Sequence, residues 1–190
     1  MFPLNVPNVL TVLRIVAVPV LVVALLGETP NGDTLAAIVF ALAAVTDGLD
    51  GYIARSRGDV TTFGKLMDPL ADKLLIVAAL VSLVALDRLA AWVAMVIIAR
   101  ELAVTGLRSV AAEQGVVIAA SWLGKVKTIL QVAAVFALIA VESSPLWVDL
   151  LVYAAVAMTL ISGADYFFGL RRTLERRRAP AAGSRGVPAE

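Results

Sequence analysis

Four aspartates stand in two pairs on either side of a short basic segment. Asp47 and Asp50 are three residues apart, and Asp68 and Asp72 are four apart, so each pair can share one face of a helix. Both pairs lie in apolar surroundings, where an ionised Asp costs roughly 2.5 to 3.5 kcal/mol at the centre of a spanning helix. Acids that a membrane segment keeps at this cost usually carry its function.

The two pairs predict a site for divalent cations. Four carboxylates cannot all stay ionised in a low-dielectric site, so either they are largely neutral or cations lie among them. The chain has no Cys and no His, and hard oxygen ligands alone select Mg²⁺, Mn²⁺ or Ca²⁺ over Zn²⁺. Two such ions can share carboxylates and hold a diphosphate for displacement at phosphorus. Gly51 and Ala54, on the face of the first pair, would let a nucleotide come close.

Six apolar stretches must position these acids. The 190 residues are 61% hydrophobic and 16% charged, which is outside the range of a soluble domain. A helical span takes about 20 apolar residues. Spans are predicted at residues 7–26, 34–55, 69–86, 89–110, 122–141 and 147–170. We therefore expect an all-α integral membrane protein with six transmembrane helices over residues 1–170. A basic cytoplasmic tail, residues 171–190, would begin as a helical stub and be partly disordered.

Pro69 leaves two starts open for the third helix. If the helix is continuous through Pro69, then Gly64, Asp68 and Asp72 share a face. Pro also favours the first helical position, which would make Asp68 the cap and place Asp72 one turn deeper. Both geometries let the second pair of acids face the first.

Basic residues predict the orientation of the chain. An even number of helices puts both termini on one side, and the segments of that side carry Arg57, Lys65, Lys125, Lys127 and the Arg-rich tail. Arg88 is the only cation in the opposite loops. By the positive-inside rule, both termini and the acids lie at the cytoplasmic face of the cell (inner) membrane.

The acidic segment resembles the signature of the CDP-alcohol phosphotransferase family. That signature is Asp, two residues, Asp-Gly, two residues, Ala-Arg, eight residues, Gly, three residues, Asp, three residues, Asp. The chain matches it at Asp47, Asp50, Gly51, Ala54, Arg55, Gly64, Asp68 and Asp72, with every spacing kept. The resemblance implies the six-helix CDP-alcohol phosphotransferase fold and two divalent cations, Mg²⁺ or Mn²⁺, held by the four aspartates. It also implies that Asp72 is the base that deprotonates the acceptor hydroxyl, a role open to a carboxylate beside metals.

Residues of the first helix and of the signature form the predicted site for the CDP-linked lipid. Asn8, Thr11 and Arg14 recur every three residues and make a polar stripe that faces the bundle. The resemblance suggests that this stripe approaches the nucleotide; a helix cap with an interface anchor is the alternative. Arg55 is a candidate contact to the diphosphate, and Gly51, Ala54 and Gly64 complete the site.

The resemblance continues outside the signature, toward family members that use glycerol 3-phosphate. The similar segments are NVPNVLTVLRI at residues 5–15, ARELAVTGLR at 99–108 and WLGKVKTILQ at 122–131. It implies transfer of a phosphatidyl group from CDP-diacylglycerol to glycerol 3-phosphate, giving phosphatidylglycerophosphate and CMP. The family also suggests a homodimer in the lipid bilayer, and no nucleic acid is expected as a partner.

A phosphorylated acceptor needs cations near the metal site, because a phosphate dianion binds best to Arg forks and Lys heads. Arg100 and Arg108 in the fourth span, with Lys125 and Lys127 at the start of the fifth, fit this need. Each could instead reach out to the membrane interface. Arg100 has a further alternative, a pair with Glu101 or with another helix.

Five more polar residues have less defined roles. Lys73 follows Asp72 and is expected to face the loop or to neutralise the acids. Thr128 and Gln131 lie one turn beyond the lysines of the fifth span and could orient either substrate. Tyr166, like its neighbour Asp165, could serve helix packing or a dimer interface.

Two other functions stay open. The same chemistry could use inositol phosphate, inositol, serine or phosphatidylglycerol as acceptor, and free inositol or serine would need no phosphate pocket. A divalent-cation transporter could also place acids within the membrane. A single acidic cluster near one face, with no matching acids in the outer loops, does not favour a transport path.

Overall fold

The computed structural model describes residues 6–27, 29–57, 62–113, 121–143 and 145–178. Within these ranges it does not describe the side chains of residues 6–8, 47–57, 62–72, 174 and 176–178.

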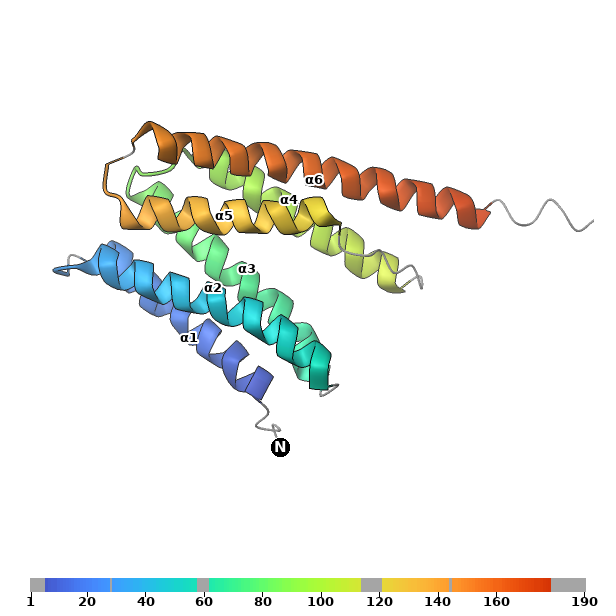
Figure 1. Ribbon diagram of the computed structural model, residues 1–190, viewed down its shortest axis with the longest axis horizontal. Coiled ribbons are helices and arrows are strands. Elements are labelled where there is room, and N and C mark those ends of the chain that lie inside the picture. The colour runs from blue at the N-terminus through green and yellow to red at the C-terminus, as the bar shows by residue number, and fades with distance from the viewer. Residues whose placement is uncertain (1–5, 28, 58–61, 114–120, 144, 179–190) are drawn as a thin grey trace, which may run out of the picture.

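Six α-helices make up this part of the chain (Figure 1). They are α1 (Val6–Leu26), α2 (Gly32–Arg57), α3 (Thr62–Ala85), α4 (Ala91–Glu113), α5 (Trp122–Ala140) and α6 (Leu146–Arg178). Each helix covers one predicted span, and no strand occurs in the described residues. The all-α prediction is therefore confirmed.

The helices pack as two groups of three. In one group α1 contacts both α2 and α3, and in the other α6 contacts both α4 and α5. The groups meet where α5 packs on α2 and α3, and where α3 packs on α4. Consecutive helices run in opposite directions (Figure 1). The start of α1, the end of α2, the start of α3 and the end of α6 therefore lie at one end of the bundle.

Small residues fill the contacts between helices. The buried core contains Ala24, Ala36, Ala79, Ala134 and Ala155 beside larger side chains such as Leu21, Phe40 and Leu80. Small side chains let helices approach closely, which is how helices associate in lipid. Large apolar side chains such as Met95, Ile129 and Leu160 are more than half exposed, as expected for a surface that faces lipid tails.

Three helices of the described chain are long and apolar enough to cross a membrane, at Val9–Leu26, Trp122–Ala140 and Leu146–Thr173. In α2 and α3 the apolar parts are shorter, Gly32–Thr46 and Lys73–Ala85. The fourth helix carries four charged residues. The remaining predicted spans are thus present as helices, but charged residues interrupt their apolar stretches.

The third helix begins seven residues before its predicted start. It runs from Thr62 through Pro69, so the alternative in which Pro69 opens the helix and Asp68 caps it is wrong. Pro removes one N–H from the helical ladder, and the turns on both sides carry the helix past it. Gly64, Asp68 and Asp72 therefore occupy one face of a continuous helix.

An ion pair lies at the end of the bundle opposite the start of α1 and the end of α2. Arg88, between α3 and α4, donates from Nη2 to Oδ2 of Asp33 in the first turn of α2 at 2.6 Å. Asn31 and Asp87 next to them have positive φ angles of 64° and 55°, a conformation that Asn and Asp tolerate. The only cation predicted for this side is therefore partly buried and links the α3–α4 loop to the start of α2.

The last helix continues beyond the membrane span. It ends at Arg178, so the helical stub predicted for the tail is confirmed and is continuous with α6. Arg171 donates to Glu175 at 2.8 Å one turn further on, and such pairs favour helix in water.

Candidate active site

The signature occupies the second half of α2 and the first half of α3. Asp47 and Asp50 lie on α2, and Asp68 and Asp72 lie on α3. The helices contact one another and place both pairs at the same end of the bundle (Figure 1). The side chains of these acids, and those of the predicted lipid-site residues Asn8, Gly51, Ala54, Arg55 and Gly64, lie outside the described side chains. No group of three potential metal ligands occurs among the side chains that are described.

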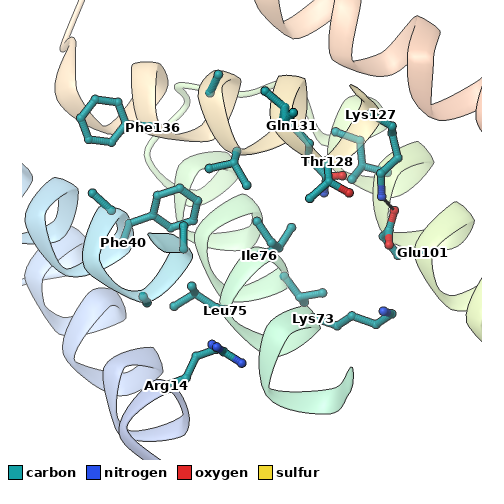
Figure 2. Close-up of a pocket in the computed structure, with 18 of the residues that line it drawn as sticks. Arg14, Phe40, Lys73, Leu75, Ile76, Glu101, Lys127, Thr128, Gln131 and Phe136 are labelled. Carbon is teal, nitrogen blue, oxygen red and sulfur yellow. Dashed lines mark hydrogen bonds and ion pairs between the residues drawn. The ribbon is translucent and has the colours of Figure 1, made fainter. Parts of the chain in front are cut away.

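A cavity of about 610 Å³ adjoins the signature and lies between the two groups of helices. Side chains from α1 to α5 line it (Figure 2). Two of its lining residues flank the signature in the chain, because Val45 precedes Asp47 by two residues and Lys73 directly follows Asp72. Apolar side chains such as Phe40, Leu75, Ile76 and Phe136 form most of the wall. The cavity thus combines an apolar wall with lining residues that lie next to the acidic segment in the chain.

Among the described side chains, four charged residues line this cavity. Arg14, Lys73 and Lys127 supply cations and Glu101 supplies a carboxylate. Arg14 and Lys127 are 3% and 5% exposed. In Figure 2 the Lys73 side chain extends toward the Lys127–Glu101 pair, and Arg14 lies across the cavity from them. Cations that line a cavity favour an anionic ligand.

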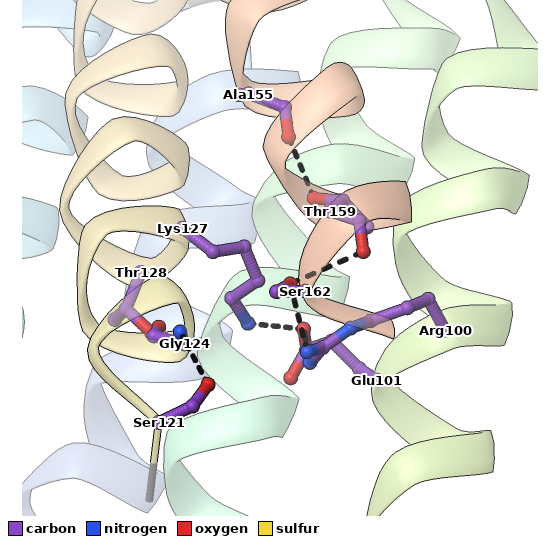
Figure 3. Close-up of polar contacts among 9 residues, drawn as sticks. All are labelled: Arg100, Glu101, Ser121, Gly124, Lys127, Thr128, Ala155, Thr159 and Ser162. Atoms are coloured by element: carbon purple, nitrogen blue, oxygen red, sulfur yellow. Dashed lines mark hydrogen bonds and ion pairs between the residues drawn. The ribbon is translucent and has the colours of Figure 1, made fainter. Parts of the chain in front are cut away.

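Glu101 connects three helices through a chain of hydrogen bonds (Figure 3). Lys127 of α5 donates from Nζ to Oε1 of Glu101, and Arg100 donates from Nη1 to the same oxygen at 3.1 Å. Arg100 also donates from Nη2 to Oγ of Ser162 on α6 at 2.9 Å. The Ser162 hydroxyl in turn donates to the carbonyl of Thr159 at 3.2 Å. The network therefore fixes α4, α5 and α6 beside the cavity.

A glycine makes room for Arg100 on the last helix. A Cβ atom at Gly163 would lie 3.3 Å from Cγ of Arg100, closer than most real contacts. Arg100 runs along α6 and does not line the cavity. Of the roles that the sequence left open for Arg100, the structure shows the pair with Glu101 and the contact with another helix.

Two predicted acceptor cations lie away from the cavity lining. Lys125 and Arg108 are exposed, and neither lines the cavity. Lys125 stands in the first turn of α5, which Ser121 caps by accepting a hydrogen bond from the Gly124 N–H at 3.2 Å. The structure thus brings Lys127 and Arg100 together through Glu101 and leaves the other two cations on the surface.

The predicted stripe on α1 faces the bundle. Thr11 and Arg14 are 1% and 3% exposed, whereas Val12 and Leu13 between them are at least half exposed. Arg14 reaches the cavity. The orientation predicted from the three-residue spacing is correct for these two residues.

Several cavity residues were missed or only partly described by the sequence. Glu101 appeared only as a partner for Arg100, although an acid inside an apolar helix is as costly as the aspartates. Lys73 was expected to face the loop or to neutralise the acids, and its place in the cavity lining was not predicted. Gln131 is 4% exposed and lines the cavity with Thr128. No signal in the sequence pointed to Ser162.

Comparison with known proteins identifies the class. The family model of the CDP-alcohol phosphatidyltransferases matches residues 4–161, which include the whole signature and the first half of α6. The chain belongs to this family.

Individual relatives resemble almost the full chain. It is 45% identical over 181 residues to the CDP-diacylglycerol--glycerol-3-phosphate 3-phosphatidyltransferase of Bacillus subtilis. This match covers 86% of this chain and 93% of the relative. It is 44% identical over 167 residues to a probable phosphatidylglycerophosphate synthase of Mycobacterium tuberculosis, covering 85% of this chain and 79% of the relative. The phosphatidyltransferase of Salmonella choleraesuis is 36% identical over 179 residues, covering 92% and 95%.

Proposed function

We propose that this protein transfers a phosphatidyl group from CDP-diacylglycerol to glycerol 3-phosphate and releases phosphatidylglycerophosphate and CMP. The observation that carries the proposal is a cavity next to the aspartate signature whose described lining includes the cations Lys73 and Lys127. Relatives named for this reaction, matched over most of their length, support the same acceptor. Neither serine nor free inositol would need the cations that line the cavity. Family membership likewise favours the enzyme over a cation transporter.

Two divalent cations, Mg²⁺ or Mn²⁺, would be held by Asp47, Asp50, Asp68 and Asp72. The fit rests on the donor set, because two contacting helices each carry two carboxylates at helical spacing. The sequence offers no softer Cys or His ligand, and carboxylates are the ligands that these ions prefer. Ions bound there supply neutralisation of the diphosphate and acidification of the acceptor hydroxyl.

Asp72 is proposed as the general base. It directly precedes Lys73, which lines the cavity, so an acceptor in the cavity lies near this end of α3. The acceptor hydroxyl gives its proton to the Asp72 carboxylate as its oxygen attacks the β-phosphorus. A bond from that oxygen to phosphorus forms, the bond to the bridging oxygen of CMP breaks, and CMP leaves with the electron pair.

The CDP-linked lipid would bind along α1 and the signature. The proposed contacts are Asn8, Thr11, Arg14, Gly51, Ala54, Arg55 and Gly64. The burial of Thr11 and Arg14 and the position of Arg14 at the cavity support this assignment. The apolar cavity wall suits the neighbouring acyl region.

The acceptor phosphate would meet cations in two stages. Exposed Arg108 and Lys125 would attract the dianion from water, and Lys127 would bind it inside the cavity. Arg100 acts in this scheme through Glu101. Lys73, which the sequence did not assign to this group, is added because it lines the same cavity.

The protein is proposed to be a homodimer in the cell (inner) membrane, with its site and both termini on the cytoplasmic side. The antiparallel helices support this orientation, because they place the signature at the same end as the basic residues Arg171 and Arg172 of α6 (Figure 1). Residues 1–170 would form the catalytic domain and residues 171–190 a basic tail.

Product analysis tests the proposal. Purified protein is supplied with CDP-diacylglycerol and radiolabelled glycerol 3-phosphate, and we expect label to move into the lipid phase in a one-to-one ratio with CMP. Parallel reactions contain radiolabelled serine or inositol. Lipid-phase label from serine or inositol, with none from glycerol 3-phosphate, would refute the proposed acceptor.

A further inference from the structure

We infer that Glu101 is a positioning residue for the acceptor site, which holds the Lys127 ammonium in the cavity and links it through Arg100 to α6. The inference rests on the proposed function, because it concerns how the phosphate of the acceptor is bound. Glu101 itself need not touch the substrate in this arrangement.

Lys127 is a flexible cation held by one partner. Its side chain is almost fully buried, and Glu101 is its only hydrogen-bond partner among the described residues. A Lys ammonium has three donors, so two remain for a ligand in the cavity that both residues line. A Lys side chain can adopt many rotamers, and the carboxylate selects one that points into the cavity.

The charge balance distinguishes this network from a simple structural ion pair. One carboxylate serves two cations, Arg100 and Lys127, so the cluster keeps one formal positive charge. Neutral Ser162 satisfies the other end of Arg100 without adding a second acid. The Lys73 side chain also extends toward the cluster (Figure 2). The excess charge beside an open cavity suits an incoming anion.

Arg100, which reaches α6, also holds the Glu101 carboxylate. Arg100 lies against Gly163, where a Cβ would come within 3.3 Å of its Cγ, and bonds to Ser162 at 2.9 Å (Figure 3). Glu101 is thereby held between a guanidinium anchored on α6 and the ammonium of α5. Movement of this carboxylate would move the Lys127 donors with it.

The test is a double-mutant cycle on the full-length enzyme, with KM measured separately for glycerol 3-phosphate and CDP-diacylglycerol. We expect Glu101→Gln to raise the acceptor KM roughly tenfold, as for loss of one well-placed charge-assisted contact. The lipid KM should stay within about twofold, because this variant leaves the proposed lipid contacts in place. In a Lys127→Ala background, Glu101→Gln should have no further effect on the acceptor KM. Glu113→Gln, which removes an exposed acid from the same helix, is the matched control and should match the wild type.

Equal increases in both KM values, or additive effects of the two substitutions, would overturn the inference and leave a purely structural role. If Glu101→Gln does not accumulate as folded protein, Glu101→Asp is measured in its place. The carboxylate of this variant is one methylene further from Lys127. That variant should raise the acceptor KM roughly threefold, and an unchanged value would equally overturn the inference. Failure of the wild type to use glycerol 3-phosphate would refute the proposed function and is read from the same assays.

Discussion

The guanidinium of Arg108 on α4 lies over the ring of Tyr166 on α6, with 5.7 Å between Cζ and the ring centroid. The Tyr166 hydroxyl is buried and has no hydrogen-bond partner among the described residues. The contact therefore uses the face of the ring. It orients an exposed cation at the end of the bundle that carries the signature, where the acceptor would arrive from water.

Substitutions of Tyr166 should distinguish the contribution of the ring from that of the hydroxyl. Tyr166→Phe keeps the ring and removes an unpaired polar group, so activity and stability should stay near the wild-type values. Tyr166→Leu removes a cation–π contact that is worth about 0.5 to 1 kcal/mol at an exposed site. The acceptor KM of this variant should rise by roughly two- to fivefold. Loss of activity in the Phe variant would instead assign a role to the hydroxyl.

Arg108→Ala should raise the KM for the acceptor more than the KM for the lipid. The variant removes a cation proposed to attract the phosphate dianion, so the KM for glycerol 3-phosphate should rise by roughly tenfold or more. The KM for CDP-diacylglycerol should change much less. Steady-state kinetics with each substrate varied in turn measures both values, and an equal effect on the two would contradict the assigned role.

Most of the helical architecture could be predicted from hydropathy. The predicted limits of α1, α2, α4 and α5 agree with the structure within three residues. The third helix starts earlier than predicted, because Pro69 resembled a helix start while the chain is already helical from Thr62. The sixth helix continues eight residues beyond its predicted span. Packing of α1 along α3 can stabilise helix there despite the lost hydrogen bond, and such a tertiary contact cannot be read from a local pattern.

Asp72→Asn should abolish turnover. The amide cannot accept the acceptor proton, and loss of a general base typically costs about 10²- to 10⁴-fold in rate. Binding of the CDP-linked lipid should persist in part, because the three other aspartates and the α1 residues remain. Single-turnover rates and a lipid-nucleotide binding assay provide the two readouts. Near-normal turnover would remove Asp72 as the base.

The site could be predicted from the sequence only in part. Fixed spacing within one helix or across one short loop predicted the aspartates and the α1 stripe, and the burial of Thr11 and Arg14 confirms the direction of the stripe. The contact of Glu101 with Lys127 joins residues 26 positions apart on different helices, and that of Arg100 with Ser162 spans 62 positions. Which cation pairs with which acid depends on helix rotation and packing. The same packing determines why Lys127 lines the cavity and Lys125, two residues earlier, is exposed.

The outer ion pair should contribute to stability and not to catalysis. Asp33→Asn leaves the partly buried Arg88 without its carboxylate, and the free energy of unfolding should fall by about 1 kcal/mol. Both KM values should be unchanged, because the pair lies at the end of the bundle opposite the signature. Thermal unfolding in detergent measures the effect, with Glu142→Gln at an exposed position of the same side as the control. A change in the acceptor KM would show that this end communicates with the cavity.

Release of CMP by the purified protein, measured for each acceptor with and without divalent cations, is the most direct test of a phosphatidyl transfer supported by the four aspartates. We predict release that requires glycerol 3-phosphate, stops on addition of EDTA, returns with excess Mg²⁺ or Mn²⁺, and is absent in a variant with Asp47, Asp50 and Asp68 changed to Asn. CMP release that persists in that variant or in EDTA, or that occurs with serine and not with glycerol 3-phosphate, would contradict it.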